Sequence, residues 1–78
     1  MRAKRPTLVI TFATTTQAMA MEKFCHANGL PGRLIPVPRE ITAGCGLSWK
    51  ANPEDQEQLT AGLTASGLGW EEMHILEI

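Results

Sequence analysis

The chain has no tyrosine, only two cysteines, and no lysine or arginine after residue 50. Aromatic residues make up 5% of its 78 residues, too few for the stacking platforms on which RNA-recognition domains hold bases. Two cysteines do not form the disulfide framework of a small secreted domain. No apolar run approaches the roughly 20 residues that a membrane-spanning helix needs. These absences argue against an RNA-binding, a disulfide-stabilised and a membrane-embedded protein.

The absence of metal-binding and phosphate-binding motifs excludes further classes of function. The sequence contains no Cys-x-x-Cys or His-x-x-x-His pair of the kind that binds zinc. Cys25 and His26 are neighbours on a predicted helix and point in different directions, so with Cys45 and His74 they do not suggest a metal site. No glycine-rich loop joins a strand to a helix, and the net charge is −1. We therefore expect no metal, no cofactor and no nucleic-acid partner.

Length and composition indicate one small folded domain. A chain of this size buries only about 60–65% of its unfolded surface, and such a thin core favours a partner or a homodimer. Hydrophobic residues make up 44% of the chain and charged residues 19%, as in folded domains. Residues 1–6 read as a flexible basic tail, and the apolar run after them is too short for a signal peptide. We expect a single domain over residues 7–78 and a cytoplasmic location.

Local signals predict elements in the order β-α-β-β-α-β. Thr14 and Gln17 fit a capping box, and Asn52 followed by Pro53 is a typical helix start. Gly29 and Gly67 are expected to end the two helices. The predicted strands are residues 7–13, 33–37, 45–50 and 73–78. This order predicts a ferredoxin-like α+β plait, with a four-stranded antiparallel sheet and both helices on one face.

The connection in the middle of the chain has an unusual composition. Pro36 and Pro38 lack an N–H and have a fixed φ, so they cannot lie within a central strand or a helix. Gly44 and Gly46 flank Cys45, and they allow positive φ while leaving the cysteine without bulky sequence neighbours. These features predict a stiff approach, a permissive loop and a thiol at the end of the loop.

The two cysteines are expected to differ. Cys25 shares a helical stripe with Met21 and Phe24, where a free cysteine packs as a small hydrophobe. Cys45 could likewise be a buried structural residue, but its loop setting favours a reactive thiol. Arg39 could stabilise the thiolate, and the glycine-flanked amides could add to that effect.

The charges are unevenly distributed, because residues 51–78 carry six acids and no lysine or arginine. One interpretation is a set of solvated faces, with acids favouring the start of the second helix. The other is a positive field around the cysteine loop from Arg33, Arg39 and Lys50. The sequence leaves both open.

The loop carries a motif that resembles the selenium/sulfur carrier-like family: Pro36-x-Pro38-Arg39-Glu40-Ile41-x-x-x-Cys45-Gly46-Leu47. The resemblance extends from Thr7 to Ile78. It implies that Cys45 carries sulfur or selenium and passes it on. Glycine at position 44, where serine is more usual in this family, and cysteine at position 25, where an aliphatic residue is usual, depart from the pattern.

On that resemblance we expect a carrier rather than a catalyst. A cysteine desulfurase or a selenium donor would load Cys45, and an acceptor protein would unload it. Arg39 would stabilise the thiolate, while Glu40 would orient Arg39 or contact a partner. Pro38, Gly44 and Gly46 would present the thiol. Two other classes stay open, a regulatory or protein-interaction module of the same fold and a thiol redox sensor.

Overall fold

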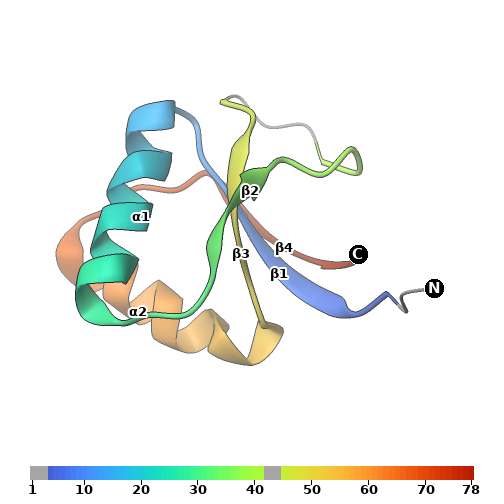
Figure 1. The fold of residues 1–78 in the computed structure, drawn as a ribbon. Coiled ribbons are helices and arrows are strands. Elements are labelled where there is room, and N and C mark those ends of the chain that lie inside the picture. Colours follow the sequence, from blue (N-terminus) through green and yellow to red (C-terminus); the bar gives the residue numbers. More distant parts are fainter. Residues whose placement is uncertain (1–3, 42–44) are drawn as a thin grey trace.

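A computed structural model describes residues 4–41 and 45–78 of the chain. Within these ranges the elements follow in the predicted order, with one additional 3₁₀ turn before the second helix (Figure 1). The strands and helices are β1 (Pro6–Thr11), α1 (Thr15–Asn28), β2 (Arg33–Pro36), β3 (Leu47–Ala51), η1 (Pro53–Asp55), α2 (Gln56–Ser66) and β4 (Glu72–Glu77).

The strands form one sheet in the order β2-β3-β1-β4, and each neighbouring pair is antiparallel. Both helices cover the same face of the sheet (Figure 1). This is the α+β arrangement of a ferredoxin-like plait, as the sequence predicted. β2 lies at an edge, where Pro36 can end the strand without disrupting a second ladder.

The main core lies between the helices and the sheet. Leu8 and Ile10 of β1 alternate toward the helices, and each is opposite a residue of β3 that faces the same way. From α2, Leu59 and Leu63 are fully buried, as their i, i+4 spacing predicts. The buried members of this cluster are Leu8, Ile10, Phe12, Ala18, Met21, Cys25, Trp49, Ala51, Leu59 and Leu63.

Helix α1 begins and ends where its sequence signals indicate. The Thr14 side chain accepts a hydrogen bond from the Gln17 N–H at 3.1 Å, and the Gln17 side chain accepts one from the Ala13 N–H at 2.9 Å. The expected capping box is therefore present, although its return bond reaches one residue further back. Gly29 ends the helix in the left-handed conformation, with a φ of 64°.

The start of the second helix differs from the prediction. Asn52 was expected to cap it directly, but its side chain makes no capping hydrogen bond, and residues 53–55 form the 3₁₀ turn η1. The Asp55 N–H donates to the Asn52 carbonyl at 2.9 Å, an i→i+3 bond that tightens the turn. Regular α-helix then begins at Gln56.

The face of the sheet without helices is also partly covered. Val9, Thr11 and Ser48 point to this face by strand alternation, yet all three are fully buried. The segment after β2, residues 37–41, runs out on this side of the sheet (Figure 1). Ile41 in this segment is buried but does not belong to the helix-side core. The segment is therefore anchored by one buried side chain, although its central residues are exposed.

The ordered domain begins earlier than the sequence predicted. A flexible tail was expected over residues 1–6, but Pro6 opens β1, and Arg5 exchanges two backbone hydrogen bonds with Ile78 at 3.2 and 3.3 Å. Residues 1–3 of the predicted tail lie outside the described residues.

The two helices of the described chain, 14 and 11 residues long, are too short and too polar to cross a membrane.

Candidate functional site

The base of the loop between β2 and β3 is closed by a backbone hydrogen bond. The Val37 N–H donates to the Gly46 carbonyl at 3.0 Å, one step beyond the regular pairing of Pro36 with Leu47. Gly46 has a φ of +78°, which L-residues rarely adopt, and a Cβ there would meet nothing within 4 Å. The sequence prediction of a glycine needed for backbone conformation is therefore confirmed at position 46. Gly44 lies outside the described residues.

A tight turn forms the near side of the loop. The Ile41 N–H donates to the Pro38 carbonyl at 3.0 Å, which places Arg39 and Glu40 at the two central positions. Both central residues are exposed, whereas Pro38 is half-buried and Ile41 is 8% exposed. Ile41 anchors the turn, a role that its lone apolar side chain after a polar pair could have indicated.

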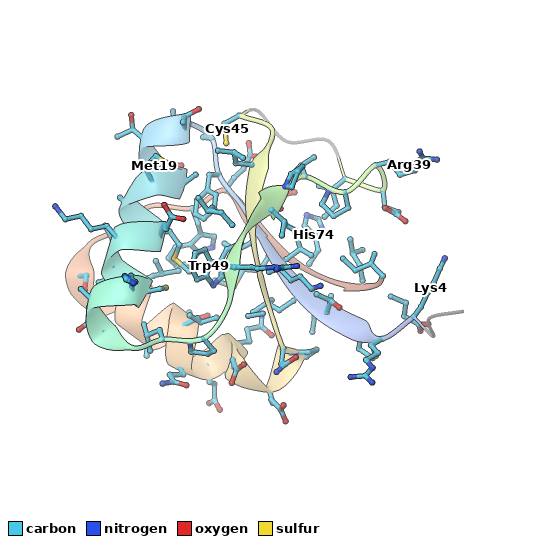
Figure 2. All side chains as sticks on the ribbon, viewed as in Figure 1. Lys4, Met19, Arg39, Cys45, Trp49 and His74 are labelled. Atoms are coloured by element: carbon cyan, nitrogen blue, oxygen red, sulfur yellow. The ribbon has the colours of Figure 1, made fainter. Side chains whose placement is uncertain are left out.

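Cys45 lies where the loop enters β3. The thiol is free and half-buried, and its side chain packs against the helix-side core. Its Sγ lies 3.6 Å from the Leu47 carbonyl oxygen, to which the S–H donates. In Figure 2 the sulfur lies at the end of the sheet at which α1 begins. The residue is thus held by the start of β3 yet remains partly accessible.

Arg39 and Cys45 are not brought together in this structure. Figure 2 shows the Arg39 side chain on the far side of the loop, pointing away from the sulfur. The reason is the turn over residues 38–41, since its two central residues are exposed while Ile41 at its end is buried. The role of Arg39 at the thiolate therefore stays a prediction that requires the turn to rearrange.

Of the two interpretations of the charge distribution, the positive field around the loop does not hold for two of its three residues. Arg33 begins β2 and Lys50 lies near the end of β3, directly opposite each other in the register. Cys45 precedes the start of β3, so both cations lie toward the other end of the sheet. Arg33 and Lys50 are near the loop in sequence, but the two antiparallel strands carry them to the other end of the sheet.

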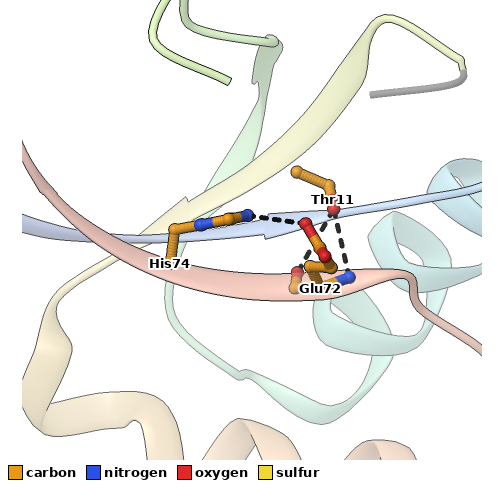
Figure 3. A network of polar contacts seen from close by, with 3 residues as sticks. All are labelled: Thr11, Glu72 and His74. Atoms are coloured by element: carbon orange, nitrogen blue, oxygen red, sulfur yellow. Dashed lines mark hydrogen bonds and ion pairs between the residues drawn. The ribbon is translucent and has the colours of Figure 1, made fainter. Parts of the chain in front are cut away.

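Neither histidine partners Cys45 within the described residues. His26 is exposed on α1, and His74 Nε2 lies 3.0 Å from Glu72 Oε1 on β4. The Thr11 hydroxyl joins β1 to the same residue, accepting from the Glu72 N–H at 3.1 Å (Figure 3). This network joins two strands on the helix-free face.

Among residues 4–41 and 45–78, no three His, Cys, Asp or Glu side chains lie close enough together to bind a metal ion.

Cys25 has the surroundings of a structural cysteine. It is 1% exposed, and its Sγ lies 3.8 Å from the Met21 Sδ one turn earlier in α1. Burial raises the pKa of the Cys25 thiol from 9.0 to about 11, because the thiolate would lose its hydration. The structure therefore places Cys25 in the core, where the helical stripe predicted it.

The fold and the loop together describe a small α+β domain that presents one thiol at a loop–strand junction. Residues 7–75 match the model of the family described as "Putative Se/S carrier protein-like". The match spans most of the chain, which therefore belongs to this family. No curated protein and no solved structure matches the chain significantly.

Proposed function

We propose that the protein carries sulfur or selenium as a persulfide or perselenide on Cys45. The observation that carries this proposal is the contrast in accessibility: Cys45 is a free, half-buried thiol, whereas Cys25 is sealed in the core. Family membership supports the same cargo. The proposed partners are a donor, such as a cysteine desulfurase, and an acceptor protein.

The chemistry is an exchange of one chalcogen atom. The Cys45 thiolate attacks the terminal sulfur of a donor persulfide, a new S–S bond forms on Cys45, and the donor thiolate leaves. In the second step an acceptor thiolate attacks the terminal sulfur of the Cys45 persulfide and releases the Cys45 thiolate. Each step forms one bond to the moving sulfur and breaks one, so no external oxidant or reductant is needed. Selenium moves in the same way as a perselenide.

The loop suits such a transfer in two respects. Gly46 leaves open space next to the cysteine, so that a partner's active site can approach the sulfur closely. The Val37–Gly46 hydrogen bond and the start of β3 fix the backbone on the C-terminal side of the thiol. A thiol on a fixed backbone loses little freedom when a partner docks, which favours fast and repeated transfer.

The test is the intact mass of the protein after incubation with a cysteine desulfurase and cysteine. Wild type should gain the mass of one sulfur atom, a reductant should remove it, and Cys45→Ala should gain none. Cys25→Ala is the matched control and should load like wild type. Loading that persists in Cys45→Ala, or wild type that gains nothing, would overturn the proposal. A repeat with selenocysteine lyase asks whether selenium is accepted.

Two variants separate the open alternatives. Arg39→Ala tests whether this arginine reaches the thiolate during transfer. If it does, the variant should load sulfur more slowly but reach the same final gain in mass. Cys45→Ser tests the regulatory alternative, because a module that only binds would keep its partner after this change. A redox sensor would instead form a reversible oxidised state on Cys45 with peroxide and accept no sulfur.

A further inference from the structure

A basic hollow lies at the end of the sheet opposite Cys45. β3 ends there, and β1 and β2 begin there. The hollow has a volume of about 680 Å³, within the range of small-molecule sites. Its charged side chains are three cations, Arg5, Arg33 and Lys50, and one acid, Asp55. The family match and the thiol do not account for this concentration of positive charge.

The three cations stand on ordered backbone. Arg33 and Lys50 are direct partners across β2 and β3, and the two backbone hydrogen bonds between Arg5 and Ile78 hold the third. Because the backbone that carries these cations is already ordered, a ligand can bind without first ordering a loop, which lowers the entropic cost of binding.

The rim of the hollow is fixed by a close contact between two segments. Gly32 has a φ of +111°, and a Cβ there would collide with the Trp49 indole and the Lys50 carbonyl. The indole Nε1 donates to the Pro31 carbonyl at 3.0 Å. Only a glycine fits between these groups, so the chain entering β2 is held tightly against β3 beside the cations.

The positive charges have no partners in the described part of the chain. Over residues 4–41 and 45–78, the ion pair found is His74 with Glu72, and no carboxylate lies within 4.0 Å of the charged nitrogens of the three cations. Like charges directly opposite on neighbouring strands repel each other, as Arg33 and Lys50 do here. An anion bound between them would remove this repulsion.

We propose that this hollow binds a small phosphate monoester. Among the charged side chains of the hollow, three cations outnumber one carboxylate, and this excess of positive charge favours a phosphate monoester, which carries a charge of about −2. Guanidinium groups suit phosphate because they donate two parallel hydrogen bonds to its oxygens. The hollow is larger than one phosphate group, and the exposed Asn52 side chain on its wall can hydrogen-bond to hydroxyl groups of the organic part.

The site is independent of the proposed sulfur transfer. Cys45 lies before the first residue of β3 and Lys50 near its last, so ligand binding does not require the thiol. Cys45→Ala should therefore bind the phosphate monoester as wild type does. The sulfur-loading experiment and the binding experiment can fail separately.

The test is an amide NMR titration with ribose 5-phosphate at constant ionic strength, with ribose as the uncharged control. We expect saturable shifts at the amides of residues 5, 7, 32, 33 and 50–52, and none with ribose. Lys50→Gln and Arg33→Gln should each weaken binding at least tenfold, whereas Lys23→Gln, with the same charge change on the exposed face of α1, should not. The same spectra show that each variant is folded.

Two further arms sharpen the result. Affinity should rise between about pH 5 and pH 7.5, as the phosphate monoester, with a second pKa of about 6, becomes a dianion. Shifts that do not saturate, or an equal loss in Lys23→Gln, would overturn the proposal. A peptide of five glutamates that binds the hollow when ribose 5-phosphate does not would also overturn it, because the surface would then dock an acidic protein segment.

Discussion

The two cysteines of this chain of 78 residues have the same side chain but differ in burial and in their surroundings. Cys25 lies on α1 with its sulfur against Met21 and no access to water. Cys45 lies at a loop–strand junction, with an exposed glycine after it, and its S–H donates a long hydrogen bond to the Leu47 carbonyl at 3.6 Å. The difference comes from tertiary placement, because the thiol group is the same. It also means that each cysteine is a matched control for the other.

The largest expected effect is on alkylation of the folded protein by iodoacetamide. Cys45 should react at least about tenfold faster than Cys25 at neutral pH, because Cys25 is 1% exposed and burial raises the pKa of its thiol from 9.0 to about 11, which lowers its thiolate fraction. Mass spectrometry of single-cysteine variants measures both rates. Equal rates in the folded protein would remove the contrast on which the carrier proposal rests.

The next effect is on the pH dependence of stability. The folded-state pKa of Cys25, about 11, lies above the unfolded value near 9, so the folded state holds this proton more tightly. The stability that this difference adds to the folded state is about 1–3 kcal/mol. It is fully present below about pH 9 and is lost as the pH rises toward 11. Urea denaturation at several pH values measures it.

The control for this pH effect is Cys25→Ala, which should lose this part of the slope while Cys45→Ala keeps it. The lysines also titrate in this range, and the comparison between variants cancels their contribution. If Cys25→Ala shows the same decline above pH 9 as wild type, burial of this thiol is not its cause.

The smallest expected effect is at Gly46. Gly46→Ala should destabilise the fold by about 1–2 kcal/mol, because alanine is strained at a φ of +78° although the position has room for a Cβ. Gly29→Ala, at the end of α1 with a φ of +64° and equal room, is the matched control and should cost about as much. Only Gly46→Ala should change the alkylation rate of Cys45, because only that glycine sets the backbone beside the thiol.

Much of the fold could be predicted because its signals are local. The Thr14 cap, the glycine stops at positions 29 and 67, and the buried pair Leu59 and Leu63 each depend on residues within one or two turns. The 3₁₀ turn after Asn52 could not be predicted with the same rules, since the sequence looks like a regular helix start and only the missing cap bond distinguishes it.

The candidate site was predictable only in part. Cys45 and Gly46 were identified from composition, because a cysteine between glycines after two prolines is unusual in any loop. The separation of Arg39 from the sulfur depends on the turn over residues 38–41, in which Arg39 is exposed and Ile41 is buried, and burial depends on which segments meet in space. The basic hollow was missed for the same reason, because Arg5, Arg33 and Lys50 are close only in space.

The sequence by itself determined the order of the elements, the cap of α1, the glycine stops of both helices and the side chains that face the core. These features follow from hydrophobic periodicity and from the backbone limits of proline and glycine, which act over a few residues. Only the tertiary structure decided which charges line the same hollow, where the turn at residues 38–41 points and how far Cys45 is buried. Those outcomes depend on strand register and on long-range packing, since a shift of one residue in the pairing of β2 with β3 would move every side chain of β2 to the other face.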